Sequence, residues 1–425
     1  CASATDRPAN RDTSTYDQVC NAHVILEQPP APTAAKKATD QRHPAPWVLS
    51  GKTDEALVAQ ADSLRSYLVE RPGLAPADIS HALATTRTAF DHRAVLLGDT
   101  EDDLMGALSA LADRQNSAFV LRGTATGAAR VAFLFSGQGS QRTGMGRELY
   151  NTYPVFAEAL DEVCALLDPH LELPLRDVMF GQDADLLGQT LYTQTALFAF
   201  HTALFRLLDS FGVRPDFLAG HSIGEISAAH AAGTLSLHDA AKLVAARARL
   251  MQQLPRGGAM IAIEATEEEL LTALEEFGDR VTIAAVNSPT SIVLSGDEGP
   301  VNQLAALWQE RGRRTRRLDV SHAFHSPHMN PILEQFRSTA RELTYHPPTI
   351  PLASNLTGTL ASPEDLTSPE YWVHHIRNTV RFHDSIQTLD QAGTTTYLEL
   401  APTTTLTPLI HQTLDNPTTI PTHPD

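Results

Sequence analysis

Residues 220–225 read Gly-His-Ser-Ile-Gly-Glu, and this stretch decides the fold because it has the form G-x-S-x-G. A short apolar run, residues 216–219, precedes it, and residues 225–232 have the composition of a helix. A sharp turn from strand to helix exposes the serine hydroxyl and needs small residues on both sides. The stretch therefore predicts an α/β fold with Ser222 as a nucleophile. Serine is also a common helix cap, but a cap does not require the two glycines.

The segments around this motif extend the α/β pattern. Residues 131–135 form a continuous apolar run that ends in glycine-rich sequence, which is typical of a buried parallel strand. Residues 155–167 and 190–211 have the composition of long helices. We therefore expect a large subdomain that resembles the α/β-hydrolase fold, built from residues 130–257 and 323–412.

A change of pattern lies within residues 258–322. Its segments are predicted in the order strand, helix, strand, strand, helix, strand, which is the arrangement of a ferredoxin-like unit. The predicted strands are residues 259–263, 281–286, 291–294 and 315–320, and the predicted helices are residues 266–276 and 300–310. We expect this small subdomain to be inserted in the large one.

The two ends of the chain differ in composition from this central part. Residues 1–20 are polar and without period, so they are expected to be disordered or added in cloning. Residues 21–27 are predicted to form a short strand, and residues 29–46 have the proline- and alanine-rich composition of an extended linker. A small α/β unit is expected at residues 47–129. Residues 413–425 are expected to form a C-terminal tail.

The composition of the 425-residue chain argues against several functional classes. Its net charge of −18 does not suit a nucleic-acid binder, which needs a basic face for phosphate contacts. No stretch reaches the roughly 18 consecutive apolar residues of a membrane helix, and residues 1–10 show no export signal. Three cysteines without ligand-like spacing are typical of a reducing compartment, so we expect a cytoplasmic protein.

The arginine-rich run at residues 311–317 is a local exception to the acidic composition. One interpretation is a solvated helix end that leads into a strand. The other is a positive field for a polyanion, such as a nucleotide-bearing cofactor or an acidic partner. The sequence leaves both interpretations open.

A nucleophilic serine needs a base, and the sequence offers histidines in two places. His221 is adjacent to Ser222, but neighbours on a tight turn point in different directions. The better candidates lie in residues 321–328, which read Ser-His-Ala-Phe-His-Ser-Pro-His. Histidines at every third position also occur in metal sites. No cysteine or carboxylate shares the spacing here, so no metal is expected.

Four motifs now occur in the order that is found in a known family. They are Gly-Gln-Gly-Ser-Gln at residues 137–141, the motif at residues 220–225, Arg247 within an Ala/Arg/Leu-rich stretch, and His-Ala-Phe-His at residues 322–325. This set resembles the acyltransferase domain of modular type I polyketide synthases, which is related to bacterial malonyl-CoA:acyl carrier protein transacylases. Upstream, residues 21–129 resemble the end of a ketosynthase and the linker that follows it.

The resemblance implies roles for the catalytic residues. Ser222 would be acylated, and His325 would act as its general base and then as the acid for the leaving thiol. The family typically orients this histidine through a backbone carbonyl, which is expected here near residues 375–378. Gln138 and the backbone N–H of Ile223 would stabilise the oxyanion.

The resemblance also implies substrate contacts. Arg247 would bind the free carboxylate of a malonyl-type group, because a guanidinium matches a carboxylate with two prongs. Its alternative is a surface arginine on an amphipathic helix. Gln194 would line the pocket, although a polar residue at a helix start is an equal interpretation. His221, His322 and Phe324 are the other expected contacts.

Selectivity is expected to depend on the side chain at position 324. In this family His-Ala-Phe-His accompanies malonyl use, whereas Tyr-Ala-Ser-His accompanies methylmalonyl use. Phe324 would fill the volume that a branch methyl needs, although excluding one methyl is worth only about 1–3 kcal/mol. The prediction is a transferase that loads malonyl from malonyl-CoA onto Ser222 and passes it to the phosphopantetheine thiol of an acyl carrier protein. No bound cofactor is expected, and a ketosynthase domain of the same polypeptide is a further expected partner.

Three alternatives stay open. The first is a transferase selective for methylmalonyl-CoA or another acyl-CoA. The second is a serine esterase or thioesterase, which shares the strand-to-helix motif but generally has an acidic residue between serine and histidine along the chain. The third is a non-catalytic scaffold, which would have no need to retain Ser222, His325 and Arg247.

Overall fold

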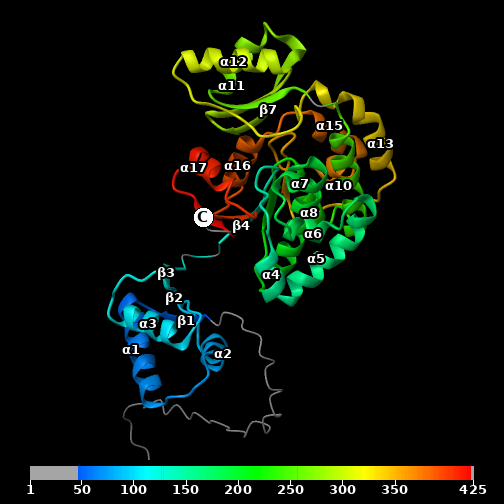
Figure 1. The fold of residues 1–425 in the computed structure, drawn as a ribbon. Helices are drawn as coiled ribbons and strands as arrows, with labels where there is room; N and C mark the ends of the chain where they lie inside the picture. The colour runs from blue at the N-terminus through cyan, green and yellow to red at the C-terminus, as the bar shows by residue number, and fades with distance from the viewer. Residues whose placement is uncertain (1–45, 126, 128, 256, 423–425) are drawn as a thin grey trace, which may run out of the picture. The chain divides into compact units, whose positions relative to one another are not determined.

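The computed structural model describes residues 46–422, apart from residues 126, 128 and 256. The strand predicted at residues 21–27 and the disorder predicted at residues 1–20 lie outside the described residues. An N-terminal unit that ends with β3 and a larger body that begins with β4 are described separately below (Figure 1).

The N-terminal unit is a three-stranded antiparallel sheet, in the order β1-β2-β3, with three helices. Its elements are β1 (Trp47–Gly51), α1 (Asp54–Glu70), α2 (Pro76–Thr86), β2 (His92–Leu96), α3 (Glu101–Ala112) and β3 (Val120–Thr124). Trp47, Leu57 and Leu108 are buried in a core that belongs to this unit alone. The side chains of Thr53 and Thr100 cap α1 and α3.

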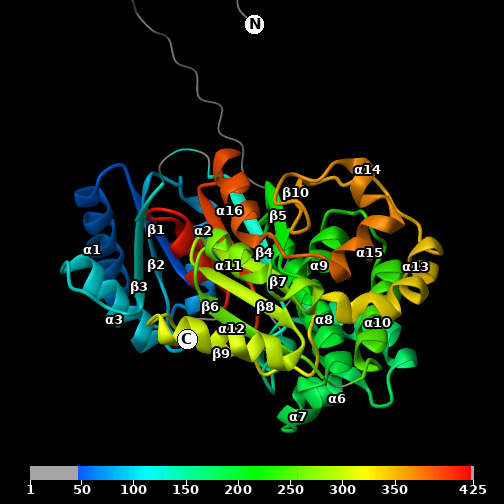
Figure 2. The same ribbon diagram turned by 90° about the horizontal axis from the view of Figure 1, so that it is seen from above.

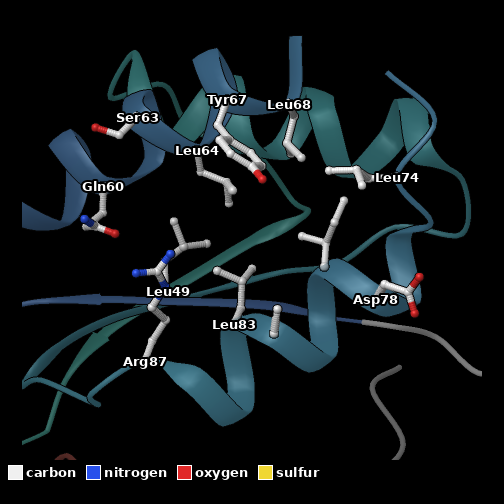
Figure 3. A pocket seen from close by; sticks show the side chains of 12 residues that line it. Leu49, Gln60, Ser63, Leu64, Tyr67, Leu68, Leu74, Asp78, Leu83 and Arg87 are labelled. Atoms are coloured by element: carbon white, nitrogen blue, oxygen red, sulfur yellow. The ribbon is translucent and has the colours of Figure 1, made fainter. Parts of the chain in front are cut away.

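A cavity of about 470 Å³ lies between α1 and α2, next to β1 (Figure 3). Its walls are mainly apolar, with Leu64 and Tyr67 contributed by α1 and Leu83 by α2. None of the candidate catalytic residues lines this cavity.

The body is organised around a five-stranded parallel sheet in the order β10-β5-β4-β11-β12. The strands are β4 (Val131–Phe135), β5 (Phe217–Gly220), β10 (Leu352–Ala353), β11 (Thr396–Leu400) and β12 (Thr418–Pro421). The central strands β4 and β5 are almost completely buried, as continuous apolar runs predict for parallel strands.

Strand β12 corrects the expected C-terminal tail at residues 413–425. Residues 418–421 form the edge strand of the sheet and pair in parallel with β11. The four residues are Thr, Thr, Ile and Pro, and none of them is buried. So short and polar a run carries no strand pattern in the sequence, and only its pairing with β11 reveals it.

Helices cover both faces of the parallel sheet. Figure 2 shows the sheet between α16 on one side and α8 and α9 on the other. The helices of the body are α4 (Arg147–Thr152), α5 (Pro154–Leu167), α6 (Leu175–Phe180), α7 (Ala184–Gly188), α8 (Thr190–Ser210), α9 (Ile223–Ala231), α10 (Leu237–Gln252), α13 (Leu333–Arg341), α14 (Pro363–Leu366), α15 (Pro369–Arg377), α16 (Phe382–Gln391) and α17 (Thr407–Thr413). Among the described residues, no helix combines the length and apolar character needed to cross a membrane.

The small subdomain interrupts the body between α10 and α13. Its four-stranded antiparallel sheet has the order β7-β8-β6-β9, and α11 and α12 lie together on one side of it (Figure 1). The elements are β6 (Ala259–Glu264), α11 (Glu267–Leu274), β7 (Val281–Ser288), β8 (Ser291–Gly296), α12 (Glu298–Glu310) and β9 (Thr315–Arg317). This topology confirms the predicted α/β fold with an inserted ferredoxin-like unit.

Candidate active site

Ser222 lies at the turn between β5 and α9. Its backbone has φ 52° and ψ −116°, which is costly for any residue with a side chain. Two glycines make the turn possible, because an added Cβ would lie 2.2 Å from Glu225 N at Gly220 and 2.1 Å from Phe135 O at Gly224. The Ser222 side chain makes no capping hydrogen bond to α9, so the capping interpretation is wrong.

The Ser222 hydroxyl instead meets a histidine. It donates a hydrogen bond to Nε2 of His325 over 2.8 Å. Nδ1 of His325 donates to the backbone carbonyl of Asn378 over 2.9 Å, and Asn378 is the C-cap of α15. A carbonyl can only accept, so the ring proton is on Nδ1 and the lone pair of Nε2 faces the serine. Asn378 lies within the range in which the orienting carbonyl was expected.

The surroundings keep His325 neutral. Burial, followed by the positive charge of Arg247, lowers the pKa of this histidine to about 3. The ring is therefore neutral at neutral pH, with Nε2 unprotonated and able to accept the serine proton. His325 also has a positive φ of 53°, so both members of the pair have strained backbones.

Arg247 is the third side chain at this point. It lies on α10, is 1% exposed, and donates from Nη2 to the Ser222 hydroxyl over 3.0 Å. Its Nε has no hydrogen-bond partner, and burial lowers its pKa to about 9, so it remains cationic at neutral pH. The surface-arginine interpretation therefore fails for Arg247 and suits its exposed neighbour Arg249. A buried cation without a carboxylate partner is costly, and it is well suited to bind an anion.

The predicted oxyanion donors lie in two neighbouring loops, the turn between β5 and α9 and the loop after β4. The N–H of Ile223 is the first of α9 and has no acceptor within the helix. Gln138 follows β4, and the preceding Gly137 lies so close to the turn that a Cβ there would be 2.8 Å from Nδ1 of His221. The loop of residues 137–141 thus packs directly against the nucleophile turn.

The two other predicted histidines have partners of their own. Nε2 of His221 bonds to Oδ1 of Asn287 over 2.9 Å, on the small-subdomain strand β7. Nε2 of His322 donates to the carbonyl of Leu254 over 2.8 Å. These hydrogen bonds connect His221 to Asn287 and His322 to Leu254, and neither is made to Ser222.

Gln194 and Phe324 are both buried. Gln194 is 2% exposed on α8, and its Nε2 donates to the sulfur of Met251 over 3.2 Å, while its Oε1 has no partner. Met251 lies one turn after Arg247 on α10, so Gln194 packs on the face of α10 that carries the arginine. Gln194 is also the fifth residue of α8, so both interpretations, a pocket residue and a polar residue at a helix start, stay open. Phe324 is 7% exposed, with its ring 6.0 Å from that of His322.

The arginine-rich run is held by the small subdomain itself. Its contacts are Arg313 with Glu269 at 3.0 Å, Arg314 with Glu264 at 2.9 Å, Arg317 with Glu298 at 2.7 Å, and Arg311 over the ring of Trp308. Four of the five guanidinium groups therefore have partners already, which favours the solvated-surface interpretation.

A second buried polar cluster, not found in the sequence analysis, lies beneath the nucleophile turn. Glu225 is completely buried and accepts hydrogen bonds from the backbone N–H of Asn355 over 2.6 Å and from the hydroxyl of Tyr371. Nε2 of His375 lies 4.0 Å from the same carboxylate. Tyr371 and His375 are four residues apart on α15, and this spacing was the one sequence signal for a shared polar face.

Comparison with known proteins places this geometry in a family. Residues 132–423 match the family described as "Acyl transferase domain", and residues 46–108 match "CurL-like, PKS C-terminal". The chain belongs to the acyltransferase domains of modular type I polyketide synthases. The resemblance seen in the sequence is thereby confirmed, and the transferase reading replaces the hydrolase and scaffold alternatives.

Curated relatives of this acyltransferase domain are much longer proteins. The chain is 50% identical over 421 residues to the spectinabilin polyketide synthase system protein NorB of Streptomyces orinoci, covering 96% of this chain and 19% of that protein. It is 48% identical over 415 residues to the phenolphthiocerol synthesis polyketide synthase type I Pks15/1 of Mycobacterium marinum, covering 96% and 20%. The chain thus spans about a fifth of the length of these relatives.

Solved structures agree with the fold. The acyltransferase domain from the second module of the salinomycin polyketide synthase is 48% identical, with a TM-score of 0.75 and 88% of each chain covered. That from module 8 of the same synthase is 36% identical, with a TM-score of 0.82, covering 89% of this chain and 90% of its own. The malonyl-CoA:acyl carrier protein transacylase FabD of Xanthomonas oryzae is 33% identical, with a TM-score of 0.64, covering 70% and 95%.

Proposed function

We propose that this domain loads a malonyl group from malonyl-CoA onto Ser222 and transfers it to the phosphopantetheine thiol of an acyl carrier protein. The observation that carries the proposal is the buried, unpaired guanidinium of Arg247, 3.0 Å from the nucleophilic oxygen. In a malonyl thioester the free carboxylate is only one carbon away from the reacting carbonyl. A carboxylate bound to Arg247 would therefore hold that carbonyl close to Ser222.

Acylation then follows from the geometry of Ser222 and His325. The Ser222 hydroxyl gives its proton to Nε2 of His325 as its oxygen attacks the thioester carbonyl. The resulting oxyanion is stabilised by the N–H of Ile223, with Gln138 beside it. When the tetrahedral intermediate collapses, the carbon–sulfur bond breaks and His325 returns the proton to the CoA thiolate.

Transfer to the carrier repeats these steps in reverse. The phosphopantetheine thiol gives its proton to His325 and attacks the ester carbonyl of malonyl-Ser222. The ester bond breaks, and the Ser222 oxygen regains the proton from His325. Water must be excluded from the ester, because hydrolysis and transfer share this intermediate. We also propose that the reaction takes place in the cytoplasm, in keeping with the cysteine content.

The first experiment tests the role of Arg247. Intact-mass measurement after incubation with an equal mixture of malonyl-, methylmalonyl- and acetyl-CoA is expected to show malonyl on the wild-type protein. Arg247→Ala is expected to lose carboxylated acyl groups and to retain acetyl transfer at a low rate, since the carboxylate contact and one hydrogen bond to Ser222 are removed while Ser222 and His325 remain. Arg249→Ala, on the exposed side of α10, is the matched control. Equal malonyl loading by wild type and Arg247→Ala would refute the assignment.

The choice of malonyl over methylmalonyl rests on Phe324 and needs its own test. Phe324 is buried next to His325, and replacing it with serine opens volume for a branch methyl. The ratio of kcat/KM for malonyl-CoA over methylmalonyl-CoA is expected to fall by roughly 10- to 100-fold in Phe324→Ser. A wild-type preference for methylmalonyl-CoA would overturn the proposed malonyl selectivity but not the proposed acyl transfer.

A further inference from the structure

Glu225 is a buried carboxylate without a cationic partner. It lies in the first turn of α9, three residues after Ser222, and its side chain is completely buried. The one ion-pair contact of its carboxylate in the described part of the chain is His375, at 4.0 Å. Burial lowers the pKa of His375 well below its ordinary value, so this ring is neutral. Burying a carboxylate without a cationic partner costs desolvation free energy, so a specific role for Glu225 is worth seeking.

The hydrogen bonds of Glu225 connect three separate segments. One carboxylate oxygen accepts the backbone N–H of Asn355, which follows β10, over 2.6 Å, and the other accepts the hydroxyl of Tyr371 on α15. The Asn355 side chain in turn donates to the carbonyl of Gly220 over 2.8 Å. The turn that carries Ser222 is therefore tied on both sides, at Gly220 and at Glu225.

Helix α15 is the element that orients the base. Its C-cap residue, Asn378, supplies the carbonyl that accepts the Nδ1 proton of His325 over 2.9 Å. Tyr371 lies two turns earlier on the same helix. The bond between Tyr371 and Glu225 thus joins the helix that presents the nucleophile to the helix that orients the histidine.

We propose that Glu225 is a positioning residue, whose carboxylate fixes α9 against α15 and thereby aligns Ser222 with His325. The inference rests on the roles proposed above for these two residues. Glu225 is not in contact with the reacting atoms. A displacement of about 1 Å between reacting groups is enough to lower a rate by roughly 100-fold.

The protonation state of Glu225 bears on this task. Burial raises the pKa of the carboxyl to about 7, against the lowering effect of the bonds from Tyr371 and Asn355. The ionised form accepts strongly from both donors at once, whereas the protonated oxygen of a neutral carboxyl is a weaker acceptor. The titratable side chains that face the carboxylate are Tyr371 and His375, both on α15.

The test measures the alignment of Ser222 and His325 without using malonyl-CoA. A fluorophosphonate probe forms a bond to the Ser222 oxygen with loss of fluoride, while His325 takes the serine proton. Its second-order labelling rate depends on this pair and does not require a carboxylate bound to Arg247. We expect Glu225→Gln to slow labelling roughly 10- to 100-fold, and Tyr371→Phe, which keeps the ring and removes one hydroxyl, roughly 3- to 10-fold.

Two matched variants control for a general loss of stability. Glu399 is also buried and accepts three backbone N–H bonds, from residues 405–407 at 2.7–2.8 Å, so Glu399→Gln makes the same chemical change elsewhere. Tyr397→Phe removes a buried hydroxyl that has no partner. Both controls are expected to label at the wild-type rate at a temperature well below every Tm.

The outcomes separate this inference from the proposed function. Slow labelling in Glu225→Gln and Tyr371→Phe, with normal controls, supports the positioning role. Wild-type rates in these two folded variants, or equally slow rates in the controls, overturn it. If the wild-type protein were not labelled at Ser222, the proposed nucleophile would fail and this inference with it.

Discussion

Ser222 and His325, the proposed nucleophile and base, have nearly the same positive φ, 52° and 53°, but they are positioned by different means. Ser222 is held by its own neighbours, since Gly220 and Gly224 approach other backbone atoms more closely than any side chain allows. His325 has no flanking glycine. Its ring is oriented by the carbonyl of Asn378, which is 53 residues away along the chain.

This difference shows which contacts offset the backbone strain at the two residues. A residue in such a conformation costs about 1–3 kcal/mol and persists only when its surroundings determine it. At Ser222 the determining contacts are part of the motif itself. At His325 the contact that orients the ring comes from the C-cap of α15, so the orientation of the proposed base depends on the packing of a distant helix.

The largest effect is expected from removing the nucleophile. Ser222→Ala is expected to lower acyl transfer by more than about 10⁴-fold and to abolish the covalent acyl adduct, because no other oxygen takes its place. Ser295→Ala, which removes a buried hydroxyl without a partner in the small subdomain, is the control. Mass spectrometry after incubation with malonyl-CoA measures both. An adduct that persisted in Ser222→Ala would contradict the assignment.

Removal of the base is expected to have the next largest effect. His325→Ala is expected to lower kcat by roughly 10²- to 10⁴-fold, because Ser222 then loses its proton acceptor. In combination with Ser222→Ala it is expected to add little, since residues that act as a unit are not additive. Steady-state kinetics of the single and double variants check this. An additive double variant would mean that the two residues act independently.

The close backbone contact that allows the Ser222 turn can be tested by replacing Gly224. Gly224→Ala would place a Cβ 2.1 Å from Phe135 O and is expected to destabilise the fold by about 1–3 kcal/mol while displacing Ser222. Gly106→Ala, in the interior of α3 with no atom within 4 Å of the new Cβ, is expected to stabilise by about 0.5–1 kcal/mol. Thermal unfolding compares them. Equal Tm changes would show that the close approach does not matter.

The pH profile sharpens the view of the base. The proposed base is the neutral form of His325, and a pKa of about 3 keeps the ring neutral from pH 8 to pH 5. In Glu225→Gln, which removes the titration of Glu225, we expect kcat/KM to change by less than about twofold over this range, whereas a histidine with an ordinary pKa would lose roughly 30-fold. A bound carboxylate neutralises Arg247, so the acid limb of kcat is expected at higher pH than that of kcat/KM. An inflection of kcat/KM near pH 6.5 in Glu225→Gln would contradict the low pKa of His325.

The smallest effect is expected from the contact that the small subdomain makes with the base. The hydroxyl of Thr282 has one proton and lies 3.4 Å from the carbonyl of His325 and 3.3 Å from that of Ser295, so its hydrogen bond to His325 is weak. Thr282→Val keeps the shape of the side chain, and kcat is expected to stay within about threefold because Asn378 still orients the ring. A larger loss, measured alongside an unchanged Tm, would assign the orientation of His325 to the small subdomain as well.

The sequence by itself determined the features whose causes are contiguous in the chain. The strand, turn and helix around Ser222 follow from residues 216–232, and the ferredoxin-like unit follows from the order of its own segments. The family motifs added the pairing of Ser222 with His325 and the importance of Arg247. These signals are readable because side-chain type and spacing carry them directly.

Only the tertiary structure decided the features that depend on backbone groups and distant contacts. The carbonyl of Asn378 has no sequence signature, because every residue has a carbonyl. The Glu225–Tyr371 bond joins residues 146 positions apart, and β12 is a strand only because β11 lies beside it. The burial that keeps His325 neutral and leaves Arg247 unpaired is likewise a property of the packed body, since desolvation depends on everything that surrounds a charge.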